Sequence, residues 1–322
     1  MGHIGGRKHR RESKVDDFIK NRKSLKRAIV DAYFGGVNDE NLTELQNQNL
    51  QFAISSNERG FNTLRQLYEE GVCVQDRRIL DIGCAYGGYT IEARRRGAAV
   101  AYGVDINRAF IDFAKLNLSD EKEDMHNACK FLCIDITSEQ SAILPRNYFD
   151  IVILNDVFEH IYDTTRLMQI INRVVEPNCT MYFEIPNGLH FFDFVEREPH
   201  YFEYGMSFLE PYYVPYKDVY YRRWEYYVAL FSYFGFKKIQ ILNPKPNNDK
   251  NTLLNEMSVK WDRIRNTLQS KYADENSELA KLVISRLKAF ESEMMHDMDE
   301  LDIEQLNIKY MQSFWKGIAY KS

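Results

Sequence analysis

The residue types with the clearest capacity for chemistry follow two apolar stretches in the first third of the chain. The run 78–83 (RILDIG) contains Asp81 and leads into a turn that holds Gly83 and Gly87. Glycines in such a turn let the backbone approach a ligand closely. The next apolar run ends in Asp105, twenty-two residues after Gly83, where a carboxylate can accept both hydroxyls of a ribose. Together the turn and the acid predict a nucleoside-binding site.

The elements that must position these residues are short apolar runs that alternate with helical patterns. Strands that alternate with helices indicate a parallel sheet covered on both faces, with ligands at the carboxyl ends of the strands. The sequence therefore predicts an α/β fold. The five runs expected to be strands are 78–83, 99–105, 130–135, 149–155 and 179–185.

Helical patterns flank this alternating region on both sides. Residues 1–70 are expected to form a basic tail and a helical lead-in, in which Asn57 is the N-cap of a helix that ends near residue 70. Residues 236–242 and 313–320 are expected to be the last two strands. The polar, helical pattern of residues 243–310 would then be an insertion before the final strand.

Further acids extend the pattern around the predicted nucleoside site. Asp135 follows the third run, and the fourth continues as residues 149–160 (FDIVILNDVFEH). This combination resembles the class I S-adenosylmethionine-dependent methyltransferases, and the resemblance covers residues 78–242. It implies a Rossmann-like seven-stranded sheet within a domain of residues 71–322, and S-adenosylmethionine as the cofactor. The residues that match the family are Asp81, Gly83, Gly87, Asp105, Asp135, Glu159 and His160.

The resemblance also assigns the half of the site that would hold the cofactor. One departure from the usual turn is Ala85, which stands where the family commonly has its middle glycine. A methyl group is tolerated in many such turns. The residues expected to bind S-adenosylmethionine are Asp81, Gly83, Cys84, Ala85, Tyr86, Gly87, Asp105, Ile106, Asp135, Ile136, Asn155, Asp156 and Val157.

The half of the site that binds the methyl acceptor is expected to come from the segment after the fifth strand. Nineteen aromatic residues lie between positions 191 and 236, and residues 187–235 are interpreted as an aromatic cap that stacks on an acceptor. His200 and His160 are the candidate general bases, and His190 is a third, because imidazole titrates near neutral pH. The prediction is O-methylation of a hydroxylated small molecule such as a sugar or glycan precursor.

Two alternatives remain open at the level of sequence. Asp156, Glu159 and His160 lie about one helical turn apart, and with His200 they resemble the metal site of methyltransferases that modify the terminal ribose of small RNAs. We assign no metal ligand on the basis of the sequence. The second alternative is a non-catalytic protein that keeps the cofactor pocket and acts as a scaffold.

Composition narrows the class of protein. The 322 residues are 44% hydrophobic and 28% charged, which is enough apolar material for a sizeable core and excludes wholesale disorder. No apolar run approaches the roughly 18 residues of a membrane span, and the N-terminus lacks the apolar centre of a signal peptide. The five cysteines are odd in number, which favours reduced thiols. We therefore expect a cytoplasmic protein without membrane insertion.

Charge is distributed unevenly along the chain. Residues 1–30 carry a net charge of +7, which leaves −12 for the remainder of a chain whose net charge is −5. A solvated terminal helix explains the basic residues better than nucleic-acid binding does. The expected partner is thus a small hydroxylated substrate, and the helical insertion offers a surface for a homodimer.

Overall fold

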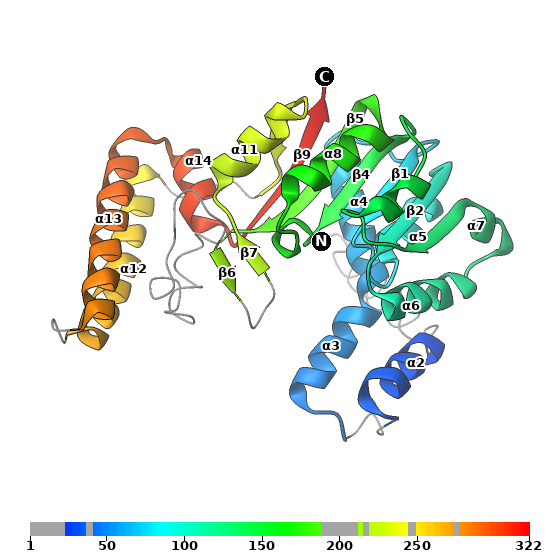
Figure 1. Ribbon diagram of the computed structural model, residues 1–322, viewed down its shortest axis with the longest axis horizontal. Coiled ribbons are helices and arrows are strands. Elements are labelled where there is room, and N and C mark those ends of the chain that lie inside the picture. The colour runs from blue at the N-terminus through cyan, green and yellow to red at the C-terminus, as the bar shows by residue number, and fades with distance from the viewer. Residues whose placement is uncertain (1–22, 37–40, 188–211, 215–218, 244–248, 274–276) are drawn as a thin grey trace, which may run out of the picture. The chain divides into compact units, whose positions relative to one another are not determined.

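The computed structural model describes residues 23–36, 41–187, 212–214, 219–243, 249–273 and 277–322 (Figure 1). Seven strands form one mixed sheet of order β3-β2-β1-β4-β5-β9-β8, and a two-stranded hairpin stands apart from it. The α/β, Rossmann-like fold class is confirmed. The helices are α2 (Lys23–Phe34), α3 (Glu44–Ile54), α4 (Ser56–Glu69), α5 (Gly88–Arg95), α6 (Arg108–Ser119), α7 (Glu123–Ala128), α8 (Thr164–Val174), α11 (Trp224–Tyr233), α12 (Lys250–Lys271), α13 (Glu278–Glu300) and α14 (Ile303–Leu306).

Each of the seven predicted strands is present within a few residues of its expected bounds. The strands of the large sheet are β1 (Arg78–Ile82), β2 (Val100–Asp105), β3 (Cys129–Cys133), β4 (Phe149–Asn155), β5 (Val175–Pro186), β8 (Phe236–Ile241) and β9 (Phe314–Lys321); those of the hairpin are β6 (Tyr212–Val214) and β7 (Val219–Tyr221). The last strand returns antiparallel and pairs with both β5 and β8.

The chain divides into two compact units. One comprises residues 1–153 and 174–176, and the other comprises residues 154–173 and 177–322. The predicted boundary at residue 70 stays a prediction.

In the first unit, parallel pairing aligns the ends of three strands. Ile82 of β1 lies opposite Val104 of β2, and Asp105 lies opposite Cys133 of β3. The carboxyl ends of these strands therefore meet at one edge of the sheet, where an α/β fold binds its ligands.

Helix α4 packs against α5 at unusually close range because glycine occupies the contact. A Cβ atom on Gly60 would lie 2.7 Å from the carbonyl oxygen of Gly88, and a Cβ atom on Gly88 would overlap the backbone of Ser56. Neither backbone leaves room for a methyl group. Because Gly88 is the first residue of α5, this contact fixes the helix that follows the predicted cofactor turn.

The prediction that Asn57 is the N-cap of α4 is wrong. The helix begins at Ser56, and Asn57 is fully buried inside it, where it pairs with Asn117 of α6 across two hydrogen bonds of 2.8 and 3.4 Å. An asparagine near the start of a helical pattern favours a cap, but here a tertiary partner satisfies the side chain.

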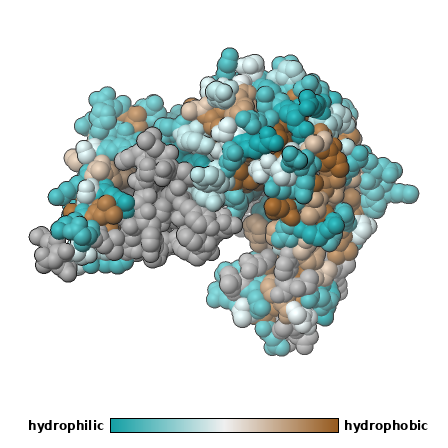
Figure 2. Space-filling view, in the orientation of Figure 1, coloured by the Kyte–Doolittle hydropathy of each residue, from teal (hydrophilic) through white to brown (hydrophobic). Residues whose placement is uncertain are grey.

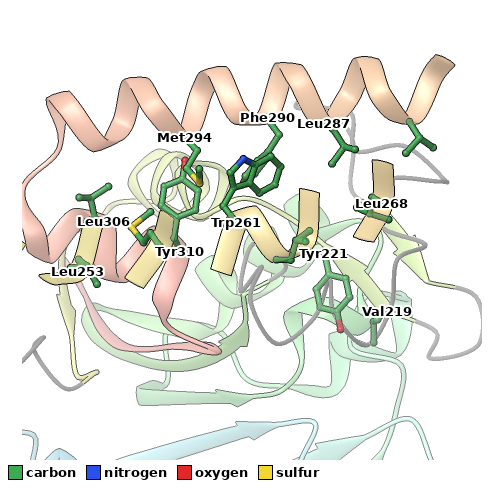
Figure 3. Packing of buried hydrophobic residues seen from close by; sticks show 13 residues of the cluster. Val219, Tyr221, Leu253, Trp261, Leu268, Leu287, Phe290, Met294, Leu306 and Tyr310 are labelled. Atoms are coloured by element: carbon green, nitrogen blue, oxygen red, sulfur yellow. The ribbon is translucent and has the colours of Figure 1, made fainter. Parts of the chain in front are cut away.

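In the second unit, α12 and α13 form a helical hairpin between β8 and β9, as predicted for the insertion (Figure 1). Figure 3 shows their facing side chains packed into one apolar cluster that also contains Val219 and Tyr221 of β7. The outside of the hairpin is mostly hydrophilic (Figure 2), with Val259, Leu282 and Met295 as exposed hydrophobic residues. The hairpin is therefore joined to β7 by a common core.

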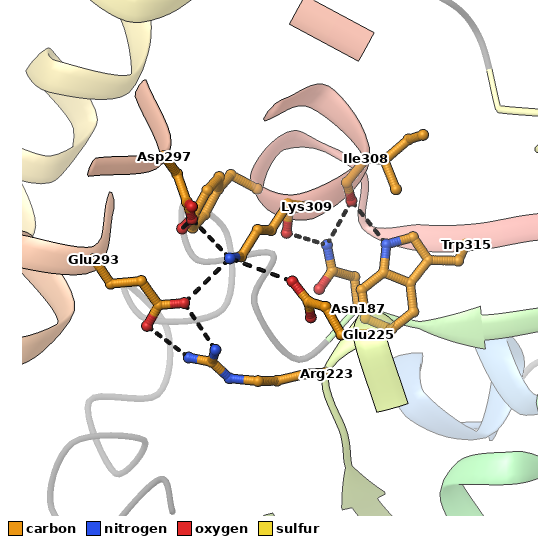
Figure 4. Close-up of polar contacts among 9 residues, drawn as sticks. Asn187, Arg223, Glu225, Glu293, Asp297, Ile308, Lys309 and Trp315 are labelled. Atoms are coloured by element: carbon orange, nitrogen blue, oxygen red, sulfur yellow. Dashed lines mark hydrogen bonds and ion pairs between the residues drawn. The ribbon is translucent and has the colours of Figure 1, made fainter. Parts of the chain in front are cut away.

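A buried ion network also links the hairpin to the start of α11 (Figure 4). The Lys309 ammonium lies 2.7 Å from Asp297, 3.1 Å from Glu293 and 3.3 Å from Glu225. Arg223 makes a bidentate pair with Glu293 at 2.7 and 2.9 Å. Bidentate geometry fixes direction as well as distance, so the network sets the register between α13 and α11.

At the close contact between α4 and α5, replacing glycine by alanine should have the opposite of its usual effect on stability. Alanine is normally the better residue within a helix by about 1 kcal/mol, yet Gly60→Ala should lower the free energy of unfolding by about 1–3 kcal/mol through overpacking. Asn62→Ala, at an exposed position of the same helix, should leave the free energy of unfolding unchanged or raise it slightly. Urea unfolding of both variants makes the comparison, and a stabilised Gly60→Ala variant would contradict the packing.

Candidate cofactor site

The turn after β1 is held by backbone hydrogen bonds to the neighbouring strand. The N–H groups of Gly83 and Cys84 both donate to the Val104 carbonyl oxygen, at 2.8 and 3.0 Å, and the Gly87 N–H donates to Cys84 at 2.8 Å. The φ angles of Gly83 and Gly87 are +69° and +77°, the left-handed region that favours glycine. These three hydrogen bonds all join one backbone group to another.

Ala85 takes a left-handed conformation as well, with φ of +44°. The family's usual glycine at this position would adopt that angle freely, whereas a side chain costs roughly 1–2 kcal/mol there. The Ala85 N–H donates to an oxygen of Asp105 at 3.0 Å. The unusual backbone angle therefore accompanies a bond that orients the predicted ribose-binding acid.

Asp105 stands at the carboxyl end of β2 with both oxygens oriented. One accepts from Ala85 N–H, and the other accepts from Asn107 N–H at 2.8 Å. A carboxylate can accept about four hydrogen bonds, so this geometry is compatible with two ribose hydroxyls. The next residue, Ile106, is 71% exposed. An apolar side chain beside a ribose-binding acid is well suited to pack on the face of an adenine ring.

Asp81 lies beneath the turn and is 2% exposed. Its side chain accepts hydrogen bonds from the N–H and hydroxyl of Thr90, at 3.2 and 2.7 Å. Burial raises the pKa of Asp81 to about 7; the Thr90 bonds lower it, and the negative charge of Asp105 adds to the rise. The observed partner of Asp81 is therefore α5, and direct contact with the cofactor stays a prediction.

The third strand supplies the remaining predicted residues of this unit. Asp135 accepts from the N–H and hydroxyl of Thr137, both at 2.8 Å, so it closes a turn after β3. Ile136 is 7% exposed, and Cys84 in the first turn is 4% exposed. These two side chains support the site from within, whereas Asp135 stands partly exposed at the edge.

Sequence reasoning missed the two asparagines that hold the turn from behind. Asn117 donates to the carbonyl oxygen of Tyr86 at 2.9 Å and also pairs with Asn57. The ring of Tyr86 lies 5.0 Å from that of Phe110 and 6.0 Å from that of Phe113. No periodicity marks such a pair, because its members lie sixty residues apart.

In the second unit, Asn155 is the last residue of β4, and Asp156 and Val157 follow it directly. Asp156 has φ of +53°, which aspartate tolerates better than most residues. Its N–H donates to the Glu184 carbonyl oxygen at 3.0 Å, and its carboxylate accepts from Asn155 at 2.9 Å. Val157 is buried. The geometry fixes this backbone firmly, and the assignment of the three residues to the cofactor stays a prediction.

The Glu159–His160 pair contains one buried and one exposed side chain. The Glu159 side chain is 5% exposed, that of His160 is 52% exposed, and their nearest charged atoms are 4.0 Å apart. Oε2 of Glu159 has no hydrogen-bond partner among the residues that the structure describes. Burial raises the pKa of Glu159 well above its usual value, with the charges of Asp156 and Glu184 adding to the effect. His190 and His200 lie outside the described residues.

Within the described ranges, no three His, Cys, Asp or Glu side chains gather closely enough to bind a metal ion. The same part of the chain holds no helix long and apolar enough to cross a bilayer.

The pKa of Asp81 predicts a pH dependence of stability. Because the folded protein holds this proton more tightly than the unfolded chain, the free energy of unfolding should fall as pH rises from about 4 to about 7. A pKa raised from 3.8 to about 7 corresponds to roughly 4 kcal/mol. Asp81→Asn keeps an acceptor for Thr90 and should remove this slope, as measured by urea unfolding between pH 4.5 and 7.5. The exposed Asp112→Asn control should retain it; parallel curves for all three proteins would refute the assignment.

Comparison with known proteins agrees with this geometry. Residues 80–183 match the methyltransferase domain family. A ubiquinone biosynthesis O-methyltransferase of Coxiella burnetii is 26% identical over 127 residues, and one from Neisseria meningitidis serogroup A is 28% identical over 130 residues; each match covers 39% of this chain. The chain spans about half the length of these curated relatives, 51% in both cases.

Among solved structures, a phosphoethanolamine N-methyltransferase 2 from Haemonchus contortus aligns with a TM-score of 0.49 at 18% identity, over 92% of this chain and 60% of its own. The segment that matches the methyltransferase domain family begins in β1 and ends in β5, so it includes the glycine turn, Asp105 and the β4 loop. Residues 80–183 are thus similar to a methyltransferase domain.

Proposed function

We propose that this protein transfers a methyl group from S-adenosylmethionine to a hydroxyl of a small molecule, such as a sugar or glycan precursor, in the cytoplasm. The observation that carries the proposal is the cradle in which the turn after β1 orients Asp105 through Ala85 N–H. The O-methyltransferase names of the relatives favour oxygen as the methylated atom.

Different residues of this chain would bind the cofactor and accept the proton of the acceptor. Asp105 accepts the ribose hydroxyls, and Ile106 packs against the base. S-adenosylmethionine supplies an activated methyl group on a sulfonium, so the protein must mainly place the acceptor in line with it. A hydroxyl acceptor also carries a proton that must leave. His160, exposed and beside buried Glu159, is the described candidate to accept that proton, and His200 is the second.

The proposal for the acceptor rests on composition around the site. The nineteen aromatic residues between positions 191 and 236 supply rings that stack on sugars or on other rings. The chain outside its first thirty residues carries a net charge of −12, which disfavours a nucleic acid or another polyanion. A neutral, hydroxylated ring compound satisfies both features.

The cofactor assignment is tested by calorimetric titration with S-adenosylhomocysteine, with NAD as the control ligand. The wild-type protein should bind S-adenosylhomocysteine at micromolar concentration and should not bind NAD. Asp105→Asn should weaken binding by about 10- to 100-fold, since a hydrogen bond to a charged group contributes about 1.5–3 kcal/mol. The matched Asp112→Asn variant should bind within twofold of wild type. Equal affinity in all three proteins would remove Asp105 from the site.

Methyl transfer then separates an enzyme from a scaffold and from a metal enzyme. With labelled S-adenosylmethionine and a panel of sugars and catechols, the protein should methylate a hydroxylated acceptor and keep full activity after exhaustive chelation. Activity abolished by chelation and restored by a divalent ion would favour the metal-dependent alternative. Cofactor binding with no transfer to any acceptor would instead favour the scaffold.

A further inference from the structure

Arg222 is a buried arginine that donates hydrogen bonds to several backbone carbonyl groups. It follows β7 directly and is 7% exposed. Nη1 donates to Phe158 at 3.2 Å, while Nη2 donates to Ile161 at 2.8 Å and to Tyr162 at 2.7 Å. A buried guanidinium is expensive unless its donors are satisfied, and here the turn after β4 satisfies them.

Arg222 adds a second donor to carbonyl groups that already accept one backbone hydrogen bond. The Phe158 carbonyl oxygen accepts from Ile161 N–H at 3.3 Å. That of Tyr162 accepts from Thr164 N–H at 3.2 Å, and a carbonyl oxygen can accept two hydrogen bonds. Buried carbonyl groups must be paired. The planar fork of Arg222 reaches three of them at once, which makes it a clamp on segment 158–162.

The clamped segment presents two side chains outward and buries two others. Phe158 is fully buried against Tyr227, and Glu159 is 4% exposed. His160 and Tyr162, in contrast, have exposed fractions of 52% and 70%. This division between buried and exposed side chains requires a fixed backbone. A small rotation of the turn would expose the Glu159 carboxyl and bury the His160 imidazole.

We propose that Arg222 is a positioning residue for the acceptor half of the site, which holds segment 158–162 so that His160 and Tyr162 face the methyl acceptor. This inference rests on the proposed methyl transfer. It assigns Arg222 no contact with either substrate. Lysine cannot replace it, since a single ammonium on a flexible stem lacks the planar fork that spans three carbonyl groups.

The chain provides a matched control in the adjacent residue. Arg223 is also largely buried, but its guanidinium pairs with Glu293 of α13. Arg222→Lys and Arg223→Lys are therefore the same chemical change at neighbouring positions with different partners. Thermal unfolding of both variants establishes that each is folded before the comparison.

Hydrogen exchange tests the clamp without any acceptor. In Arg222→Lys the amides of His160 and Ile161, which donate within the turn, should exchange at least tenfold faster than in the wild type. Arg223→Lys should leave them unchanged, and both variants should bind S-adenosylhomocysteine within twofold of the wild type. Unchanged exchange in Arg222→Lys, or equal acceleration in both variants, would overturn the proposal.

Methyl transfer to catechol, a minimal dihydroxylated ring, tests the consequence for catalysis. Arg222→Lys should lower kcat at least tenfold with the KM for S-adenosylmethionine within twofold, and Arg223→Lys should change neither. A wild-type kcat in Arg222→Lys would also overturn the positioning role. If the wild type methylates neither catechol nor any sugar of the panel, the proposed acceptor class fails, while the exchange comparison still decides the clamp.

Discussion

The first unit depends on the turn after β1. The backbone of this turn must remain in the left-handed region, and the side chains of the turn itself do not hold it there. Two hydrogen bonds to the Val104 carbonyl oxygen tie the turn to β2, and one from Asn117 holds its far side. Because backbone groups make the contacts, the turn keeps its surface free for a ligand. Side chains elsewhere then serve mainly to keep this backbone in place.

The surrounding helices keep the turn in place through pairs of buried polar groups. Asp81 beneath the turn bonds to α5, and the Asn57–Asn117 pair joins α4 to α6. A buried polar group without a partner costs about 1–3 kcal/mol, so each pair disfavours any displacement of its helices. The apolar cluster around Tyr86, which α2 and α3 help to form, closes the same region. The N-terminal helices are thus part of the support for the turn rather than an appendage to it.

The sequence was a good guide to the strands and to the cofactor turn, because local features mark both. Apolar runs located all seven strands of the sheet, and Gly83, Gly87 and Asp105 marked the edge where β1 and β2 end. Asn57 misled because its local pattern favours a cap while its partner lies sixty residues away. Arg222 and Lys309 escaped notice for the same reason, since a single basic residue carries no periodicity and its partners are set only by the fold.

The helical insertion takes on a role in the second unit that its polar sequence does not suggest. Asn187, the residue that follows β5, donates to the carbonyl oxygen of Lys309 at 3.0 Å (Figure 4) and to that of Gln312 at 2.8 Å. At the other end of the aromatic stretch, Tyr221 packs in the core of the hairpin and Arg223 pairs with α13. Breaking one partner of a buried ion pair costs more than the pair contributes, so these anchors resist separation. The insertion therefore contacts Asn187 at the start of the predicted cap and Tyr221 within it.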